Sequence, residues 1–273
     1  MAELPEILKI TKQMNDTLKN KTISRIELLQ EKCSNVSSDD FNKTCIGAHI
    51  HRIENKGKWI ITFLSNGYAI LLSLGMGADV LYYENEESAA SKYQVKMTFD
   101  DKSGYTVKFW WFGKFLLSAQ NELPDEPNTK SIGINPFDRR FSEEHFIALL
   151  NGKKTQIKAF LLNQKNIGGI GNMYMHDILF LSNLHPQSKI SSISKQDVKN
   201  LYKSILSVLK LSQSKDAFEH ELDFFGNKGH YGMDDFLIGY KEKSPCPKCG
   251  EAIILIKTGS TSSFICPKCQ KKM

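Results

Sequence analysis

The spacing of hydrophobic residues divides the chain into a helical start, a long β-rich stretch and a second helical stretch. Over residues 5–19, apolar residues recur at the period of a helix, and Pro5 suits its first turn. From Thr22 to Leu117, short β-branched and aromatic runs alternate with polar turns, which predicts an antiparallel sandwich or barrel. The runs are Thr22–Ile23, Ile46–Ile53, Trp59–Leu64, Tyr68–Leu72, Val95–Phe99 and Tyr105–Leu117, with Asn66-Gly67 as a hairpin turn.

A polar, proline-bearing stretch from Glu122 to Arg140 separates this β-rich region from a helical one. Ser142 should begin one helix and Thr155 should cap another. Further helices are expected over residues 173–181 and 196–211. Between them, the glycines of residues 168–172 interrupt the helical pattern. They either leave backbone amides uncovered for a phosphate or form a simple tight turn.

Four cysteines near the end of the chain form the strongest chemical pattern. Two CPKC motifs, Cys246 to Cys249 and Cys266 to Cys269, are separated by sixteen residues that read as a β-hairpin. This spacing predicts one structural zinc per chain, because four thiolates fill a tetrahedral ion and leave no position for water. Cys33 and Cys45 lie far off in sequence and are expected to be buried or free thiols.

Composition permits a polyanionic partner. The 273 residues carry a formal net charge of +6, and the last segment is rich in lysine, including Lys257. A basic ribbon of this kind either grips a phosphate backbone or serves as a solvated or protein-binding surface. No apolar run approaches the roughly 20 residues that span a bilayer, and the acidic N-terminus is no secretory signal, so we expect a cytoplasmic protein with no membrane partner.

The first six residues, MAELPE, carry candidate catalytic chemistry. Removal of Met1 would leave the α-amine of Ala2, which titrates near pH 8 and is a useful nucleophile at neutral pH. Glu3 beside it could transfer protons, and the positive end of the following helix favours its carboxylate. The alternative is an ordinary acidic helix start.

Taken together, these motifs resemble the formamidopyrimidine-DNA glycosylase/endonuclease VIII family of base-excision repair enzymes. The resemblance covers nearly the whole chain, and its motifs occur in the family's order. They are Ala2–Glu6, Lys56-Gly-Lys58-Trp, Leu74-Gly-Met76, Asn163–Tyr174 with Asp177–Phe180 and His185-Pro186, and Cys266–Gln270.

The resemblance implies an α+β fold in four parts. Residues 1–125 would form an N-terminal helix and β-sandwich, and residues 126–141 a linker. Residues 142–240 would form a helical domain with a helix–two-turn–helix, and residues 241–273 a zinc-finger hairpin with four cysteine ligands. DNA, double-stranded or single-stranded, would lie in the cleft between the domains, bound by a monomer, at the nucleoid if the protein is bacterial.

The resemblance also implies roles for individual residues. The Ala2 amine would attack C1′ of a damaged nucleotide extruded from the helix, Glu3 would act as general acid and base, and Glu6 would support the amine. Lys58 and Asn172 would hold the flanking phosphates. Met76 would enter the duplex, Phe112 would contact DNA, and a specificity loop would lie within residues 216–235. The finger would bind DNA through the region of Lys257 and Thr261.

Three positions depart from the family pattern. Ala2 replaces a proline, so the covalent intermediate would be an imine that needs protonation. The resemblance therefore supports base release more firmly than strand cleavage. Thr261 replaces an arginine that clamps a phosphate. Trp110 replaces an arginine two residues before Phe112. Either Trp110 fills the void in the duplex by stacking, or Trp110 and Trp111 alternate on a strand and one of them belongs to the core. Two alternatives remain open: a monofunctional glycosylase that uses a Glu3-activated water, and a non-catalytic lesion-binding protein.

Overall fold

The computed structural model describes residues 2–272 and contains two compact units. Unit 1 combines the chain up to Ser131 with Asp216–His230, and unit 2 combines Ile132–Lys215 with the chain from Tyr231 onward. Within the described residues, no helix is both long and apolar enough to cross a bilayer.

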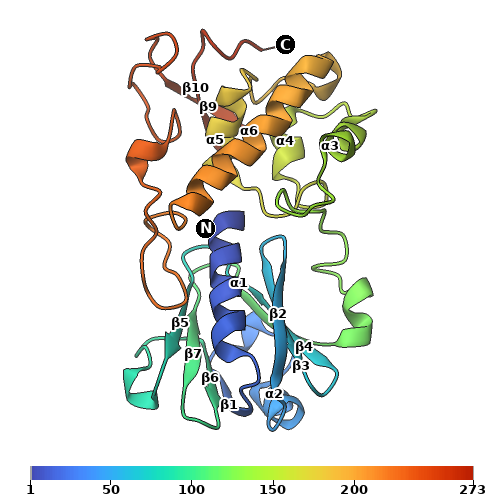
Figure 1. Cartoon of the computed structure of the whole chain (residues 1–273), viewed down its shortest axis with the longest axis vertical. Coiled ribbons are helices and arrows are strands. Elements are labelled where there is room, and N and C mark those ends of the chain that lie inside the picture. The colour runs from blue at the N-terminus through green and yellow to red at the C-terminus, as the bar shows by residue number, and fades with distance from the viewer. Residues whose placement is uncertain (1, 273) are drawn as a thin grey trace. The chain divides into compact units, whose positions relative to one another are not determined.

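Unit 1 begins with helix α1, Leu4–Leu18, one residue earlier than predicted. Its buried face carries Ile7, Ile10 and Met14, which join the main hydrophobic core. The helix lies beside strand β2, where the backbone N–H of Ile53 donates to Asn15 Oδ1 at 2.8 Å (Figure 1). The N-terminal residues of the chain are therefore fixed to the sheet by both apolar packing and a side-chain hydrogen bond.

Two four-stranded antiparallel sheets form the predicted sandwich (Figure 1). One sheet has the order β1 (Ile23–Leu28), β6 (Val95–Phe99), β7 (Gly104–Lys108) and β5 (Asp79–Tyr83). The other has the order β2 (Ile50–Lys56), β3 (Trp59–Leu64), β4 (Tyr68–Ser73) and β8 (Lys114–Ala119). Apolar side chains of both sheets share one core, in which Phe99 and Phe115 are fully buried.

Strand β3 is buried on both faces, which explains why its sequence is continuously apolar rather than alternating. Ile60 faces the main core, whereas Ile61 and Phe63 belong to a second cluster on the opposite face of the sheet. Leu123 of the 3₁₀ helix η3, Gln120–Asp125, packs against that second cluster. The polar stretch predicted as a linker therefore begins as a cover for the sheet.

Two elements of unit 1 were not predicted. Strand β5 contains the apolar and aromatic run Val80–Tyr83, whereas helix α2, Ser38–Cys45, lies in a mostly polar segment. The helix starts because Ser37 Oγ accepts from the backbone N–H of Asp40 at 3.1 Å. The expectation for Cys33 and Cys45 is confirmed: both are buried free thiols, and burial raises the pKa of Cys45 to about 12.

Unit 2 contains the four main helices of the second stretch: α3 (Glu143–Leu150), α4 (Ile157–Leu162), α5 (Asn172–Leu181) and α6 (Lys195–Ser214) (Figure 1). Ser142 caps α3 as predicted, since its Oγ accepts from His145 N at 3.1 Å. The capping role expected of Thr155 is wrong. Gln156 precedes α4, and the backbone of this segment pairs with Lys189 and Ile190 instead.

The finger hairpin comprises β9 (Ile254–Thr258) and β10 (Thr261–Ile265). The segment leading to it is fastened by Asp177 of α5, which is 1% exposed. Its carboxylate accepts backbone hydrogen bonds from Leu237, Ile238 and Gly239 at 2.7, 3.0 and 3.0 Å. The mixed helix and antiparallel-sheet fold, ending in a four-cysteine hairpin, is as the sequence predicted.

We expect Asp177→Ala to lower the free energy of unfolding by roughly 3 kcal/mol, because three backbone N–H groups, two of them buried, lose their carboxylate acceptor. Urea unfolding of the zinc-loaded chain measures the change. Asp234→Ala, at an exposed position in the same segment, is the control and should unfold as the wild type does. Equal stability of the two variants would contradict the proposed fastening.

Candidate active site

The first residues of unit 1 are buried despite their charge. Ala2 is 4% exposed, and Glu3 and Glu6 are each 3% exposed. Glu3 is the N-cap of α1, with an extended backbone (φ −111°, ψ −167°), and its carbonyl oxygen accepts the first helical hydrogen bond from Ile7 N at 3.0 Å. A carboxylate at this place lies at the positive end of the helix. Met1, whose removal would free the Ala2 amine, lies outside the described residues.

Glu6 connects two separate parts of the backbone. Its Oε2 accepts from Glu3 N at 2.9 Å, and its Oε1 accepts from Phe218 N at 3.1 Å. The structure thus brings Glu3 and Glu6 together, and it adds the segment around Phe218, which follows them by more than two hundred residues in the sequence. Since both oxygens of Glu6 are occupied by N–H donors, this carboxylate is suited to fixing Glu3 rather than to transferring protons itself.

Lys58 lies in the tight turn between β2 and β3 and is partly buried. Gly57 beside it has φ +58°, a conformation that favours glycine, and its carbonyl oxygen accepts from Asn55 Nδ2 at 3.2 Å. The turn therefore has a defined backbone that can aim the lysine at a ligand.

Met76 and the aromatic residues that follow β7 form an exposed apolar group. Met76 is 41% exposed, Trp110 68%, Trp111 61% and Phe112 78%. Met76 N donates to Trp111 O at 2.9 Å, so the two loops are held side by side. Both tryptophans are exposed, which excludes the alternative that one belongs to the core. Four large apolar side chains at one exposed place are more than a monomeric surface needs.

Close approach of the same two loops requires glycine at position 75. Gly75 has φ +60°, and a Cβ atom there would lie 2.1 Å from Trp111 O. The leucine–glycine–methionine motif is thus explained by backbone geometry: Gly75 lets the chain turn so that Met76 pairs with Trp111.

In the glycine-rich turn between α4 and α5, the Gln164 side chain and the backbone of Ile134 occupy several of the backbone polar groups. Gln164 Oε1 accepts from Gly169 N at 2.8 Å, and Gln164 Nε2 donates to Ile170 O at 2.7 Å. Gly168 N donates to Ile134 O at 3.2 Å. The expectation that this turn leaves its amides uncovered is therefore wrong for Gly168 and Gly169, whose N–H groups are already engaged.

Asn172, the first residue of α5, is partly exposed and lies at the end of this turn. Its Nδ2 is 3.4 Å from His176 Nε2, and its Oδ1 has no hydrogen-bond partner among the described residues. Its Nδ2 is thus only weakly used within the chain and can donate to a ligand, whereas its buried Oδ1 can only accept a hydrogen bond.

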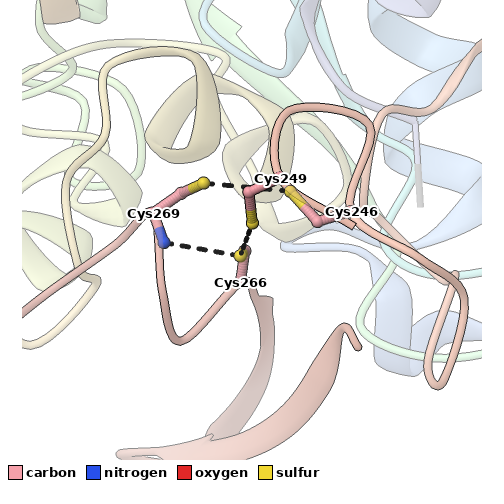
Figure 2. A group of neighbouring side chains, drawn as sticks. All are labelled: Cys246, Cys249, Cys266 and Cys269. Atoms are coloured by element: carbon pink, nitrogen blue, oxygen red, sulfur yellow. Dashed lines mark hydrogen bonds between the residues drawn. The ribbon is translucent and has the colours of Figure 1, made fainter. Parts of the chain in front are cut away.

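The four finger cysteines form a metal site (Figure 2). Their Sγ atoms all lie within 4.8 Å of one another, with 3.9 Å between Cys246 and Cys269 and 3.5 Å between Cys249 and Cys266. Tetrahedral zinc with Zn–S bonds near 2.3 Å requires sulfur separations of roughly 3.8 Å, so the residues fit the ion.

Backbone N–H groups complete the surroundings of the zinc ligands. Lys248 N donates to Cys246 Sγ and Cys269 N donates to Cys266 Sγ, each at 3.4 Å. Such donors favour thiolates over thiols, and four thiolates leave no open position on the ion. The four cysteines therefore hold a structural zinc.

Lys158 is a site residue that the sequence analysis missed. It is 4% exposed, and its Nζ donates to Thr258 Oγ1, Ser262 O and Ser263 Oγ at 2.7, 2.9 and 2.8 Å. These oxygens belong to both strands of the finger hairpin. Burial lowers the pKa of Lys158 to about 8. In the sequence, Lys158 follows Ile157 on a short apolar helix. A lysine at such a position is expected at the surface, so its burial cannot be predicted without the fold.

Lys257 and Thr261 lie on this hairpin. Lys257 is exposed in β9, whereas Thr261 is partly buried and its hydroxyl donates to Thr258 O at 3.4 Å. Thr261 is thus used inside the hairpin, and Lys257 is the exposed cation of the pair.

Comparisons with known proteins match these parts in order. The N-terminal domain of formamidopyrimidine-DNA glycosylase matches residues 1–110, its H2TH domain residues 132–220, and a zinc finger found in FPG and IleRS residues 243–272. A formamidopyrimidine-DNA glycosylase of Mycoplasma mobile is 32% identical over 275 residues, which cover 99% of each chain. This chain belongs to the formamidopyrimidine-DNA glycosylase family.

Other members agree with that assignment. A formamidopyrimidine-DNA glycosylase of Streptococcus pyogenes is 29% identical over 282 residues, covering 100% of this chain and 99% of the relative. Lactococcus lactis Fpg in complex with DNA containing an abasic site has the same fold, with a TM-score of 0.90 at 22% identity over 99% of this chain and 100% of that chain. The family resemblance of the motifs is confirmed, whereas the roles of individual residues remain predictions.

We predict that Cys249→Ser lowers the zinc content below one ion per chain and severely weakens DNA binding, because coordination supplies most of the folding energy of so small a hairpin. Metal analysis and a DNA-binding titration measure the two effects, and unit 1 should stay folded. Cys33→Ser, which removes a buried thiol outside the finger, is the control and should retain its zinc. One zinc per chain in the Cys249 variant would rule the site out.

Proposed function

We propose that this family member is a DNA repair glycosylase that uses the α-amine of Ala2 as nucleophile and Glu3 as general acid and base. The observation that supports the proposal is the buried start of α1, where Glu6 holds the backbone N–H of Glu3, the residue that follows Ala2. Proton transfer depends on such fixed geometry.

The chemical steps follow from these groups. The nitrogen of Ala2 attacks C1′ of the damaged nucleotide, the bond from C1′ to the base breaks, and the base departs with its electron pair and a proton. Glu3 assists by transferring a proton at the sugar, whose ring opens to give an imine between Ala2 and C1′. Protonation of that imine gives an iminium, and Glu3 as general base then removes a proton from C2′, whose electron pair forms a double bond to C3′ and expels the 3′ phosphate. Water hydrolyses the resulting unsaturated imine and returns the free amine.

A primary amine makes the second stage slower than the first. The imine of Ala2 must gain a proton before it withdraws electrons, whereas a proline in the same place would give a permanent iminium cation. We therefore infer that base release precedes strand cleavage and that cleavage is weak.

The other predicted residues bind DNA in this proposal. Lys58 and Asn172 hold phosphates on either side of the extruded nucleotide, and Lys257 adds a charge from the finger. Met76, Trp110 and Phe112 replace the extruded base in the stack, since aromatic side chains stack without reading sequence. We infer that the substrate is damaged DNA and that a monomer acts on it in the cytoplasm.

We expect an N-terminal tag that blocks the Ala2 amine to abolish covalent trapping on abasic DNA with borohydride while DNA binding stays nearly intact. Trapping reports the imine, which a blocked amine cannot form. Glu3→Gln should lose base excision although its amine is free. Ala2→Pro should speed strand cleavage if the amine type is limiting.

The matched control for the tag is the same tag placed after Met273, which should trap as the untagged chain does. If a chain with a blocked amine still releases bases at the normal rate, the amine is not the nucleophile. Glu3 would then activate a water and the protein would be a monofunctional glycosylase. An untagged chain that binds lesions but never excises or traps would be a lesion-binding protein.

DNA affinity should fall steeply with salt, because each phosphate contact adds a counterion-release slope near −0.9 for duplex DNA. Lys58→Ala should weaken binding to all sequences and flatten the slope by about one. Binding titrations at several salt concentrations measure both, with Lys12→Ala, an exposed lysine paired with Asp16, as control. An affinity independent of salt would remove the phosphate backbone as the ligand.

A further inference from the structure

Unit 2 contains a cavity of about 680 Å³, and none of the residues that line it belongs to the candidate active site. Its walls come from α3, the turn after α3, the 3₁₀ helix η4 (Ile190–Ser192) and the start of α6. All of these elements belong to unit 2 (Figure 1). Ligand sites in proteins usually measure roughly 300–1,000 Å³, so the cavity is large enough to receive a ligand.

The lining of the cavity is mostly apolar. Leu150 and Ile190 are buried, whereas Ile193 and Val198 are half-buried and Ile147 is 41% exposed. The last three therefore leave apolar surface open to solvent around one hollow. Apolar surface that is gathered in one place and rimmed by polar residues marks an interaction site.

Helix α3 is apolar on two faces, which accounts for this surface. Phe146 and Leu150 pack inward, and the Phe146 ring lies 6.0 Å from that of Tyr202 on α6. Ile147 and Ala148 are exposed and line the cavity. A surface helix normally carries polar residues on its outer face. The second apolar face of α3 therefore lacks a cover among the described residues of unit 2.

Four exposed lysines surround the cavity. Lys153 and Lys154 come from the turn after α3, and Lys195 and Lys199 come from the start of α6. Lys199 Nζ is 3.4 Å from Glu143 Oε1. Within the part of the chain that the structure describes, the other three lysines have no carboxylate at ion-pair distance. Cations from two separate elements thus flank the apolar lining without being neutralised.

Glu144 is the one carboxylate among the described residues that line the cavity. It lies in the first turn of α3, where hydrogen bonds from its own backbone N–H and from Ser142 lower its pKa. Glu144 is therefore ionised but engaged at the start of its helix. The surroundings of the cavity keep a net positive charge.

We propose that this cavity binds an acidic segment of a partner protein. The apolar side chains of the segment enter the cavity, and its carboxylates pair with Lys153, Lys154 and Lys195. Charge complementarity favours this occupant, because lysines from two elements call for several carboxylates spaced along one ligand. A peptide with apolar and acidic residues supplies both parts. The inference goes beyond the proposed function, since no residue of the cavity takes part in the proposed reaction.

Two other ligands fit the cavity less well. A nucleic acid base is held mainly by stacking on aromatic side chains, and none of the described lining residues is aromatic. Phosphates would pair with the lysines but would leave Ile147, Ile193 and Val198 in water. A fatty acid would cover the apolar lining but has a single carboxylate for lysines of two elements. Both ligands are outcomes of the test.

The test uses the full zinc-loaded chain and a panel of short fluorescein-labelled peptides that combine leucine and phenylalanine with several glutamates. The apolar residues recur at helical spacing in some peptides and alternate in others. Each peptide has two counterparts, one with glutamine in place of glutamate and one with serine in place of the apolar residues. We expect saturable binding by fluorescence anisotropy, and an affinity at least about tenfold lower for either counterpart.

Variants of the chain locate the bound peptide. Lys153→Glu combined with Lys154→Glu should weaken peptide binding about tenfold or more, because repulsion replaces attraction. Lys203→Glu combined with Lys210→Glu, at exposed α6 positions outside the cavity, makes the same change in net charge and should bind within about threefold of the wild type. Ile147→Ser removes exposed apolar surface without changing the charge and should also weaken binding.

The same variants are assayed for base release and for affinity toward duplex DNA with an abasic site. The variant of Lys153 and Lys154 should match the variant of Lys203 and Lys210 in both, because the cavity has no part in the proposed reaction. A greater loss of DNA affinity in the variant of Lys153 and Lys154 would assign these lysines to DNA and overturn the proposal.

Two further results would contradict a peptide site. One is that no acidic peptide binds the wild-type chain better than its glutamine and serine counterparts. The other is that dodecanoate binds and Ile147→Ser weakens its binding, whereas no peptide binds. A wild-type chain that binds the peptides but releases no base would contradict the proposed function alone, which distinguishes the two failures.

Discussion

The two oxygens of the Glu6 carboxylate are the connection on which the candidate site depends. One binds the N–H of Glu3 and the other binds the N–H of Phe218, and the Glu6 side chain that accepts both bonds is buried. A buried carboxylate that lost either donor would keep a poorly solvated charge, so each contact stabilises the other. The start of α1 and the segment around Phe218 are therefore held together by one side chain, although they are distant in sequence.

A second buried charge, on Lys158, connects the two strands of the finger hairpin. The Lys158 ammonium donates to oxygens on both strands of the hairpin, and all three of these acceptors are uncharged. The zinc fixes the cysteine end of the hairpin, and Lys158 fixes the other end near Thr258. A hairpin of two five-residue strands has little core of its own, so these two attachments supply its order.

The elements that were predicted correctly have strong local patterns in the sequence. Strand β3 was predicted with its observed bounds, Trp59–Leu64, because a run of apolar residues ends at a glycine turn on each side. The zinc ligands were predicted because two CxxC motifs at this spacing have few other uses. Strand β5 was missed although Val80–Tyr83 is an apolar and aromatic run, and helix α2 was missed because its segment is mostly polar.

The site was predictable only in part, because several of its contacts join residues that are distant in sequence. Glu3 and Glu6 could be placed together because they share the first turn of one helix. Nothing local could show that Phe218, Asp223 and Phe224 return to that helix, since residues 216–230 carry no apolar period. Lys158 was overlooked because a lysine is nearly always exposed unless oxygens surround it. The missed residues all bind through long-range contacts.

The departures at Ala2, Trp110 and Thr261 share one physical consequence. Each exchanges a group with a fixed charge or a committed geometry for a neutral one: an imine for an iminium, an indole for a guanidinium, and a hydroxyl used inside the hairpin for an exposed cation. The proposed site therefore relies less on charge held by these three side chains and more on backbone positions fixed by Glu6, Gly75 and Lys158. Precise placement can raise a reaction rate as much as added charge does, provided that the scaffold is rigid. The buried anchors supply that rigidity, which supports the proposal that a chain without these charges acts as a glycosylase.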